Sequence, residues 1–256
     1  MGIIMFNGAS SKDYGIEVEH PPKYNYPERD YTIVHVPGRN GDLVLDSESY
    51  QNVERVYELA IGEYHGDFTV LANRLSTWLH SARTYARLED SYEPEYYRMA
   101  LYKEGTSIEN FFHQGGRVEV TFNCKPQRFL KEGEKAVSIT KGDIWVNPTN
   151  QVAKPLIKIT GSSGTFTIGD RTVTLNTINE YIMLDSELEH AYKGLTNCNA
   201  NISALYFPVL NTGANTITWT GNITAVEIIP RWWTLSFQYY ILQQLLHLQQ
   251  EELASL

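Results

Sequence analysis

The sequence predicts a mainly β protein, with an α+β domain in the N-terminal half and an all-β domain in the C-terminal half. Three observations support this prediction: segments in which alternate residues are apolar, one amphipathic helix, and a C-terminal half of short extended runs separated by Gly, Asn and Ser. At 256 residues the chain is long enough for two domains that each bury a core.

Strands with one buried face are predicted across the N-terminal half. The clearest is Arg117–Cys124, in which every second residue is apolar, as expected when alternate side chains point into a core. The other predicted strands are Ile3–Phe6, Gly15–Glu19, Tyr31–Val36, Val53–Ile61 and Tyr96–Tyr102.

One amphipathic helix interrupts these strands. Its apolar positions recur at helical spacing and are Phe68, Leu71, Ala72, Leu75, Trp78, Leu79 and Ala82. Asp67 precedes them and is placed to accept hydrogen bonds from the first exposed amides. Because the apolar stripe must be buried, we expect the helix to lie on a face of the N-terminal sheet.

The domain boundary is predicted between Lys125 and Ala136. Pro126 and Gly133 interrupt the periodicity there, and the charged run Lys131–Lys135 is interpreted as a solvated linker. The N-terminal domain is therefore predicted over residues 1–130 and the C-terminal domain over residues 137–235.

The C-terminal domain is predicted to be a β-sandwich or jelly roll, because short strands follow one another at regular spacing. The segment Gly161–Gly164 is interpreted as a hairpin turn. The predicted strands are Lys154–Thr160, Thr165–Ile168, Thr172–Ile178, Tyr181–Asp185, Thr216–Trp219 and Ala225–Pro230.

Residues 236–256 differ in kind, because they are rich in Leu and Gln and favour a helix. Such a tail could dock on a neighbouring subunit, form a coiled coil, or be foreign to the native protein. It takes no part in the fold prediction.

The charge and the cysteine and histidine content argue against several classes of protein. A net charge of -9 without a dense Lys/Arg cluster argues against a nucleic-acid or membrane-surface partner. Cys124 and Cys198 are too few and too far apart for a zinc motif or a disulfide framework. The histidines are scattered, so no metal site is predicted. We also expect no signal peptide.

Short motifs recur in order along the chain. In the N-terminal half they are Phe6-Asn7-Gly8, Asp13-Tyr14-Gly15-Ile16, Val36–Asp42, Tyr50-Gln51-Asn52 and Cys124-Lys125-Pro126. In the C-terminal half they are Asn147-Pro148-Thr149, Ala153-Lys154-Pro155, Phe207-Pro208, Gly213-Ala214-Asn215 and Pro230–Trp233. Through this order and its total length, the chain resembles the distal tail protein (Dit) family of long-tailed, non-contractile bacteriophages (siphophages).

The resemblance implies an N-terminal β-domain that carries a helix and a projecting hairpin and assembles into a hexameric ring. It also implies a C-terminal galectin-like β-sandwich that faces outward. Such a protein is a structural hub at the tail tip of the virion, synthesised in the host bacterial cytoplasm. Its implied partners are further copies of itself, the tail tube protein, the tail-associated (tail tip) protein and the receptor-binding or baseplate proteins. It is no enzyme and needs no cofactor.

The loop block of the N-terminal half is a candidate for the seam of that ring. Its residues are Pro37, Gly38, Arg39, Asn40, Gly41 and Asp42. A phosphate-binding loop would need a following helix with Lys and Ser/Thr, whereas a strand-like segment follows here. The two glycines suit a loop built for shape, and the resemblance assigns the block to a hairpin that pairs with the next subunit.

Carbohydrate binding is the main alternative, in the form of a module that contacts host cell-wall polysaccharide. A sugar site stacks an aromatic ring on the pyranose, and Trp145 and Trp219 are the candidate residues. The galectin signature of His, Asn and Arg on one strand is not visible, and a shared fold does not carry function over.

A wall-degrading glycosidase is the other alternative. Asp185, Glu187 and Glu189 alternate, so in a strand they would share one face, with neighbours roughly 6.5–7 Å apart. That separation is compatible with carboxylate catalysis. Acidic residues on one strand face are more often simply solvated, so no catalytic residue is predicted.

Overall fold

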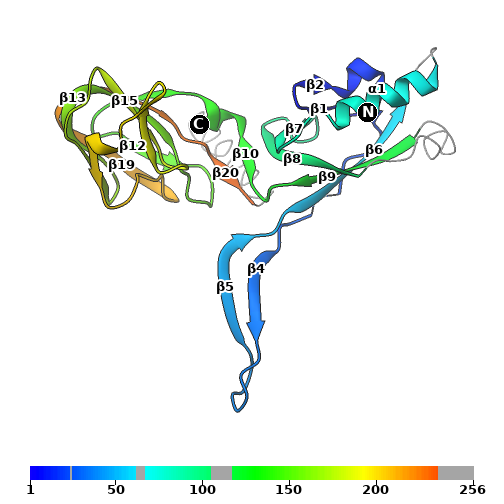
Figure 1. Ribbon diagram of the computed structural model, residues 1–256, viewed down its shortest axis with the longest axis horizontal. Helices are drawn as coiled ribbons and strands as arrows, with labels where there is room; N and C mark the ends of the chain where they lie inside the picture. Colours follow the sequence, from blue (N-terminus) through cyan, green and yellow to red (C-terminus); the bar gives the residue numbers. More distant parts are fainter. Residues whose placement is uncertain (24, 62–66, 105–116, 236–256) are drawn as a thin grey trace, which may run out of the picture. The chain divides into compact units, whose positions relative to one another are not determined.

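The computed structural model describes residues 1–23, 25–61, 67–104 and 117–235. The chain forms two compact units, Met1–Arg128 and Phe129–Leu256. Strands dominate both units, and the α-helix lies in the first (Figure 1), so the predicted mainly β fold class is confirmed. The helix predicted for residues 236–256 lies outside the described residues.

The first unit is built on one antiparallel sheet with the strand order β2-β1-β7-β8-β9-β6-β3. A bridge between Gly2 and Val18 brings the chain just before β1 against β3, which lies at the far end of this order, so the sheet is curled. The strands are β1 (Ile4–Phe6), β2 (Ala9–Ser10), β3 (Ile16–Val18), β6 (Val53–Ile61), β7 (Ala86–Asp90), β8 (Tyr96–Glu104) and β9 (Arg117–Cys124).

The predicted bounds of β6 and β9 are confirmed, and these two strands pair along their length from Val53↔Cys124 to Ala60↔Arg117. Their alternate side chains are buried, among them Tyr57 on β6 and Phe122 on β9, which pack in one core with residues of β1 and β3. The period-2 pattern of the sequence therefore identifies the buried face correctly.

The helix α1 spans Phe68–Leu79, and the predicted cap is confirmed, since the Asp67 side chain accepts a hydrogen bond from the Thr69 amide at 2.7 Å. Leu75, Trp78 and Leu79 lie in the core of the first unit, as predicted. The Trp78 Nε1–H donates to the Phe6 carbonyl at 3.0 Å, which fixes the helix over the end of β1.

Two of the N-terminal motifs have a geometric role. Asn7 and Gly8 have φ angles of 49° and 83° and form the two-residue turn between β1 and β2, which requires positive φ at both positions. Gly15, at φ 67°, ends the short 3-10 helix η1 (Ser11–Tyr14), and the Ser10 and Asp13 side chains form a capping box at its start.

The second unit is built around two long strands, β13 (Leu156–Ile168) and β19 (Gly213–Ile229). They pair with each other from Leu156↔Ile229 to Ile168↔Ile217. One sheet has the order β11-β19-β13-β15-β16-β17, and β12, β14 and β18 join β19, β13 and β14 respectively.

Shorter strands and 3-10 helices make up the rest of the chain after β9. Besides β13 and β19, the elements after β9 are β10 (Arg128–Leu130), η2 (Lys131–Glu134), β11 (Val137–Ile139), β12 (Ile144–Asn147), β14 (Arg171–Leu175), β15 (Tyr181–Asp185), β16 (His190–Lys193), β17 (Thr196–Asn197), η3 (Asn199–Asn201), β18 (Ile202–Ala204) and β20 (Trp233–Thr234).

The predicted hairpin turn at Gly161–Gly164 is wrong, because these residues continue β13 as a bulged segment. The register against β19 shifts on either side of Gly161, where the two backbones come very close. A Cβ on Gly164 would lie 2.1 Å from the Thr220 carbonyl oxygen, and one on Gly161 would lie 2.3 Å from that of Asn222. The glycines permit a bend within paired strands rather than a reversal of the chain.

The same bend changes the partners of β13. Before the bulge it pairs with β15, and after the bulge it pairs with β14. Two predicted pairs of short strands are therefore two long bent strands, Lys154–Thr160 with Thr165–Ile168 and Thr216–Trp219 with Ala225–Pro230. Period-2 patterning does not reveal this, because the pattern is interrupted in the same way by a turn and by a bulge.

The solvated-linker interpretation of Lys131–Lys135 is also corrected. Lys131–Glu134 form the 3-10 helix η2, in which Gly133 is buried and a Cβ would lie 2.5 Å from the Trp232 backbone nitrogen. The Gly133 carbonyl accepts a hydrogen bond from the Arg231 amide at 2.8 Å. Because most residues of this segment are charged, its composition suggests exposure to water and does not reveal that Gly133 is packed against Trp232.

Two buried asparagines of the C-terminal motifs satisfy backbone groups. Asn215 is 1% exposed, and its amide donates to the Asn211 and Gly213 carbonyls, while its oxygen accepts from the Asn211 amide. Asn147 lies opposite Gly213 in the β12–β19 pair and donates to the Leu210 carbonyl at 3.1 Å. Such side chains replace ladder bonds where the backbone is irregular.

We predict that Gly164→Ala destabilises the second unit by at least ~3 kcal/mol, because the new methyl group would force the two long strands apart. Gly194→Ala is the matched control, since Gly194 also has positive φ but no atom lies within 4 Å of its would-be Cβ. That control should cost about 1–2 kcal/mol. Urea unfolding followed by tryptophan fluorescence measures both, and equal losses would contradict the bulge assignment.

Candidate functional site

The first candidate site is a hairpin arm made of β4 (Arg29–Val34) and β5 (Leu43–Tyr50). Among the residues that the structure describes, the two strands pair only with each other and form their own two-stranded sheet. Figure 1 draws the arm as a long ribbon that extends away from the curled sheet of the same unit. An isolated two-stranded hairpin is marginally stable in water, so its stability calls for a partner.

Apolar side chains are exposed on both faces of the arm. Ile33 and Val44 lie opposite each other and are 57% and 58% exposed. Leu45 lies opposite Thr32 on the other face and is 51% exposed. Strands that carry apolar residues on both faces are typically covered on both faces.

A bulge divides the arm. The register passes from Asp30↔Ser49 to Tyr31↔Asp46, so Ser47 and Glu48 have no opposite residues, and Glu48 has a φ of 54°. Arg29 spans the bulge and contacts the Asp46 carboxylate at 2.5 and 3.1 Å. The Glu48 backbone amide, together with Arg29, holds the pKa of Asp46 below its ordinary value.

The tip of the arm carries the six residues predicted at the ring interface. Pro37, Gly38, Arg39, Asn40, Gly41 and Asp42 are all exposed. The Arg39 amide bonds the Val36 carbonyl at 3.2 Å, with Gly38 at φ 81°, which is a turn that needs glycine at its third position. His35 and Asp42 lie 3.1 Å apart at the base of the tip. The structure places these six residues at the tip but does not test whether they contact another subunit, so their interface role stays a prediction.

The tryptophans predicted to stack on sugar are placed differently from each other. Trp219 is 8% exposed and faces the interior of the second unit, so it offers no ring face to a sugar and is removed from the candidates. Trp145 is half-buried and packs on the buried Trp232, with ring centroids 5.7 Å apart. Both rings point inward, because both residues occupy strand positions whose side chains face the interior of the unit.

The three carboxylates considered for glycoside hydrolysis do not share a strand face, so the predicted arrangement is wrong. β15 ends at Asp185, and the following turn contains Glu187 and Glu189. Asp185 instead receives two hydrogen bonds from Arg231, at 2.7 and 2.9 Å. Burial raises the pKa of Asp185, but these bonds and two backbone amides outweigh it and lower the pKa overall.

Glu19, His20 and Glu58 form a group whose possible metal-binding atoms lie within 4.8 Å of one another. Residue spacing could not reveal it, because Glu58 comes from β6, which pairs beside β3. Arg117 already contacts the Glu19 carboxylate at 2.5 Å. Since exposed acidic groups commonly gather without an ion, the group supports no metal assignment.

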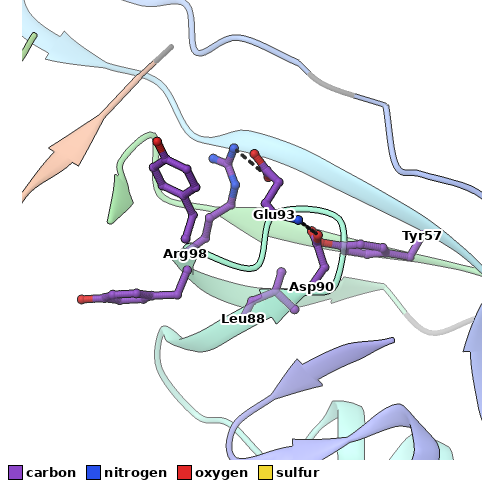
Figure 2. A pocket seen from close by; sticks show the side chains of 7 residues that line it. Tyr57, Leu88, Asp90, Glu93 and Arg98 are labelled. Carbon is purple, nitrogen blue, oxygen red and sulfur yellow. Dashed lines mark hydrogen bonds and ion pairs between the residues drawn. The ribbon is translucent and has the colours of Figure 1, made fainter. Parts of the chain in front are cut away.

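A cluster of buried charges lies in the first unit, where Arg55, Asp90, Glu93, Arg98 and Arg128 converge. We call it the Glu93 cluster. Glu93 accepts a hydrogen bond from Arg55 at 2.6 Å, pairs closely with Arg128, and lies 3.9 Å from Arg98. Each of these side chains is at most 9% exposed. Figure 2 shows Glu93, Arg98 and Asp90 around a small pocket.

Asp90 completes the cluster. It accepts a hydrogen bond from the Tyr57 hydroxyl at 2.8 Å and from the Tyr92 and Glu93 amides, each at 2.9 Å. Burial raises the pKa of Tyr57 well above its ordinary value, and the Asp90 charge adds to this. Burial and the neighbouring Arg55 charge lower the pKa of Arg98. The tyrosine therefore remains a neutral hydrogen-bond donor.

The pocket beside the cluster has a volume of about 10 Å³, which is room for about one water molecule. It is too small for a substrate, so the cluster is structural. Sequence reasoning missed it, although a signal exists: Arg55 occupies the buried phase of β6, between Val53 and Tyr57. Arg98 stands in the same way between Tyr96 and Ala100 on β8.

We predict that Glu93→Gln destabilises the first unit by about 3–5 kcal/mol, because it leaves three buried guanidinium groups with one carboxylate in the cluster. The matched control is Glu54→Gln, which removes the exposed ion pair with Lys103 on the same sheet. The control should cost less than about 1 kcal/mol. Equal losses in denaturant unfolding would show that the cluster has no special role.

The sequence was compared with protein families and with curated proteins. No family model and no curated protein matches it. Within the part of the chain that the structure describes, no helix is long and apolar enough to cross a membrane.

Two solved phage structures are similar to this chain. The first is phage SPP1 Dit (gp 19.1), described as a paradigm of the hub adsorption apparatus in phages that infect Gram-positive bacteria, with a TM-score of 0.67 and 15% identity over 89% of this chain and 98% of that one. The second is the phage p2 baseplate in its activated conformation with Sr, at TM-score 0.47 and 12% identity over 89% and 97%. The first match confirms the resemblance read from the motifs: over most of its length, this chain has the fold of the SPP1 Dit protein.

Proposed function

We propose that this protein is a structural hub of a bacteriophage tail, which joins the tail tube to the adsorption apparatus. The single observation that carries the proposal is an exposed hairpin arm, apolar on both faces, on a chain with the fold of SPP1 Dit. The role requires positioning and association, and no bond-making step.

Copies of the chain close a ring, which we take to be hexameric, through the arm. The arm offers two unpaired strand edges and two apolar faces, so a neighbouring copy can extend the sheet and cover the side chains together. A head-to-tail contact of this kind forms a ring when its rotation closes. The tip residues Pro37–Asp42 belong to this seam.

The apolar residues of the arm contribute part of the energy for such a contact. Tyr31, Ile33, Val34, Val44 and Leu45 are each between 37% and 58% exposed. Burying the exposed part of each contributes roughly 1 kcal/mol, or on the order of 5 kcal/mol per arm before the entropic cost of association. Backbone hydrogen bonds along the free edges add to this.

The remaining assignments follow from the hub role. The ring of first units contacts the tail tube protein above and the tail-associated protein below. The second unit, a galectin-like sandwich, faces outward and carries receptor-binding or baseplate proteins. The protein is a component of the virion at the tail tip.

We predict that the purified protein forms a hexamer and that Ile33→Glu with Val44→Glu reduces it to monomers, because two charges would be placed on one face of the seam. The measurement is the mass in solution by light scattering over a range of concentrations. Leu188→Glu with Leu195→Glu is the matched control, since these exposed residues lie in the second unit.

The control variant should assemble like the unmodified protein. Circular dichroism of all three proteins checks that the fold is retained. A monomer at every concentration, or an arm variant that assembles normally, would contradict the proposed use of the arm.

A further inference from the structure

The second unit carries two rows of hydroxyl side chains on its outer surface. Each row crosses neighbouring strands and follows from the strand register. The first row runs across β19, β13, β14 and β18 through Thr220, Thr165, Thr174 and Ser203. The second row runs across β19, β13 and β14 through Thr218, Thr167 and Thr172.

Residues directly opposite in an antiparallel pair share a face, so both rows lie on one surface. Side chains within a row are roughly 4.5–5.5 Å apart, and the rows are roughly 7 Å apart. Thr165 and Thr220 are joined by a hydroxyl contact of 2.6 Å, and Thr167 and Thr172 by one of 2.9 Å. Thr172, Thr174, Thr220 and Ser203 are exposed.

This surface, the hydroxyl face, carries no charged side chain. Its margin on β12 is formed by Ile144 and Val146, opposite Thr216 and Ala214. Charged residues make up 20% of the chain, and its net charge is -9. Edge strands such as β12 and β18 normally carry charges that prevent unwanted pairing. An uncharged face that reaches both margins is therefore unusual for a surface exposed to water alone.

Threonine also favours strands for local reasons, and Thr–Thr pairs stabilise a sheet. That accounts for one or two such pairs on an exposed face. It does not account for seven hydroxyl side chains at neighbouring positions with no Lys or Glu among them. Charged residues are tolerated elsewhere on the same long strands, as in the half-exposed ion pair of Lys158 on β13 with Glu227 on β19.

We propose that the hydroxyl face binds a neutral polysaccharide chain lying across the strands. Each threonine hydroxyl both donates and accepts hydrogen bonds, as do the hydroxyls of a glycan, and the regular spacing presents them as a repeating array. The absence of charge matches an uncharged ligand, and the rows contain none of the Trp, Tyr or Arg residues that dominate protein–protein contacts. This binding is independent of the hub role.

The proposal moves the sugar site to the opposite side of the strands from the tryptophans. Trp219 stands between Thr218 and Thr220 and points into the core, while Trp145 stands in the same way between Ile144 and Val146. The strands considered for sugar binding thus present hydroxyl or aliphatic side chains, and no ring, to the outside.

The test is native affinity electrophoresis of the full-length protein in gels that contain laminarin, dextran or hydroxyethylcellulose, with polygalacturonate as an anionic comparison. Thr172→Val with Thr174→Val removes two exposed hydroxyls at nearly constant shape. Thr172→Ser with Thr174→Ser keeps the hydroxyls. Thr140→Val with Thr196→Val is the matched control, since both residues are exposed in the second unit and outside the rows.

We expect retardation in at least one neutral gel and none in the anionic gel. The valine pair should weaken binding at least about tenfold, whereas the serine pair and the control pair should bind like the unmodified protein. Normal melting of the valine variant shows that its fold is retained. The proposal is wrong if no neutral gel retards the protein, if the anionic gel retards it more, or if the valine pair has no effect.

Discussion

The buried ion pairs around Glu93 are the constraint on which the first unit depends. Five charged side chains from β6, β7, β8, the β7–β8 connection and the end of the unit meet away from water, and Glu93 pairs with all three of the arginines. Arg55 connects the cluster to the arm, because β6 begins three residues after the arm's second strand ends at Tyr50. The cluster therefore holds the strand from which the arm extends.

Local patterns in the sequence predict the elements whose causes are local. The bounds of β6, β9 and β15 follow from alternation, and α1 follows from its apolar stripe and its Asp67 cap. Motif residues such as Asn7 and Asn215 are explained by geometry, since one adopts a turn and the other satisfies backbone groups. Their conformational roles do not depend on a ligand.

Features that depend on distant partners are missed by such patterns. A bulge and a turn interrupt alternation alike, so the long strands β13 and β19 are predicted as pairs of short ones. Strand β7 is missed because its sequence is short and largely charged. The hydroxyl face also needs the register, because Thr165, Thr174 and Thr220 come from three segments that only the pairing aligns. The sequence suggests a hairpin in this region, whereas the exposure of its apolar side chains is known only from the structure.

The claim that the arm pairs with another copy is tested most directly by amide hydrogen exchange of β4 and β5 at several protein concentrations. In an isolated ribbon, the amides that point away from the partner strand should exchange as fast as those of an open chain. We predict that these outward amides become protected as concentration rises, at the same point at which the mass increases. Rapid exchange of these outward amides at concentrations at which assembly is complete would contradict the account.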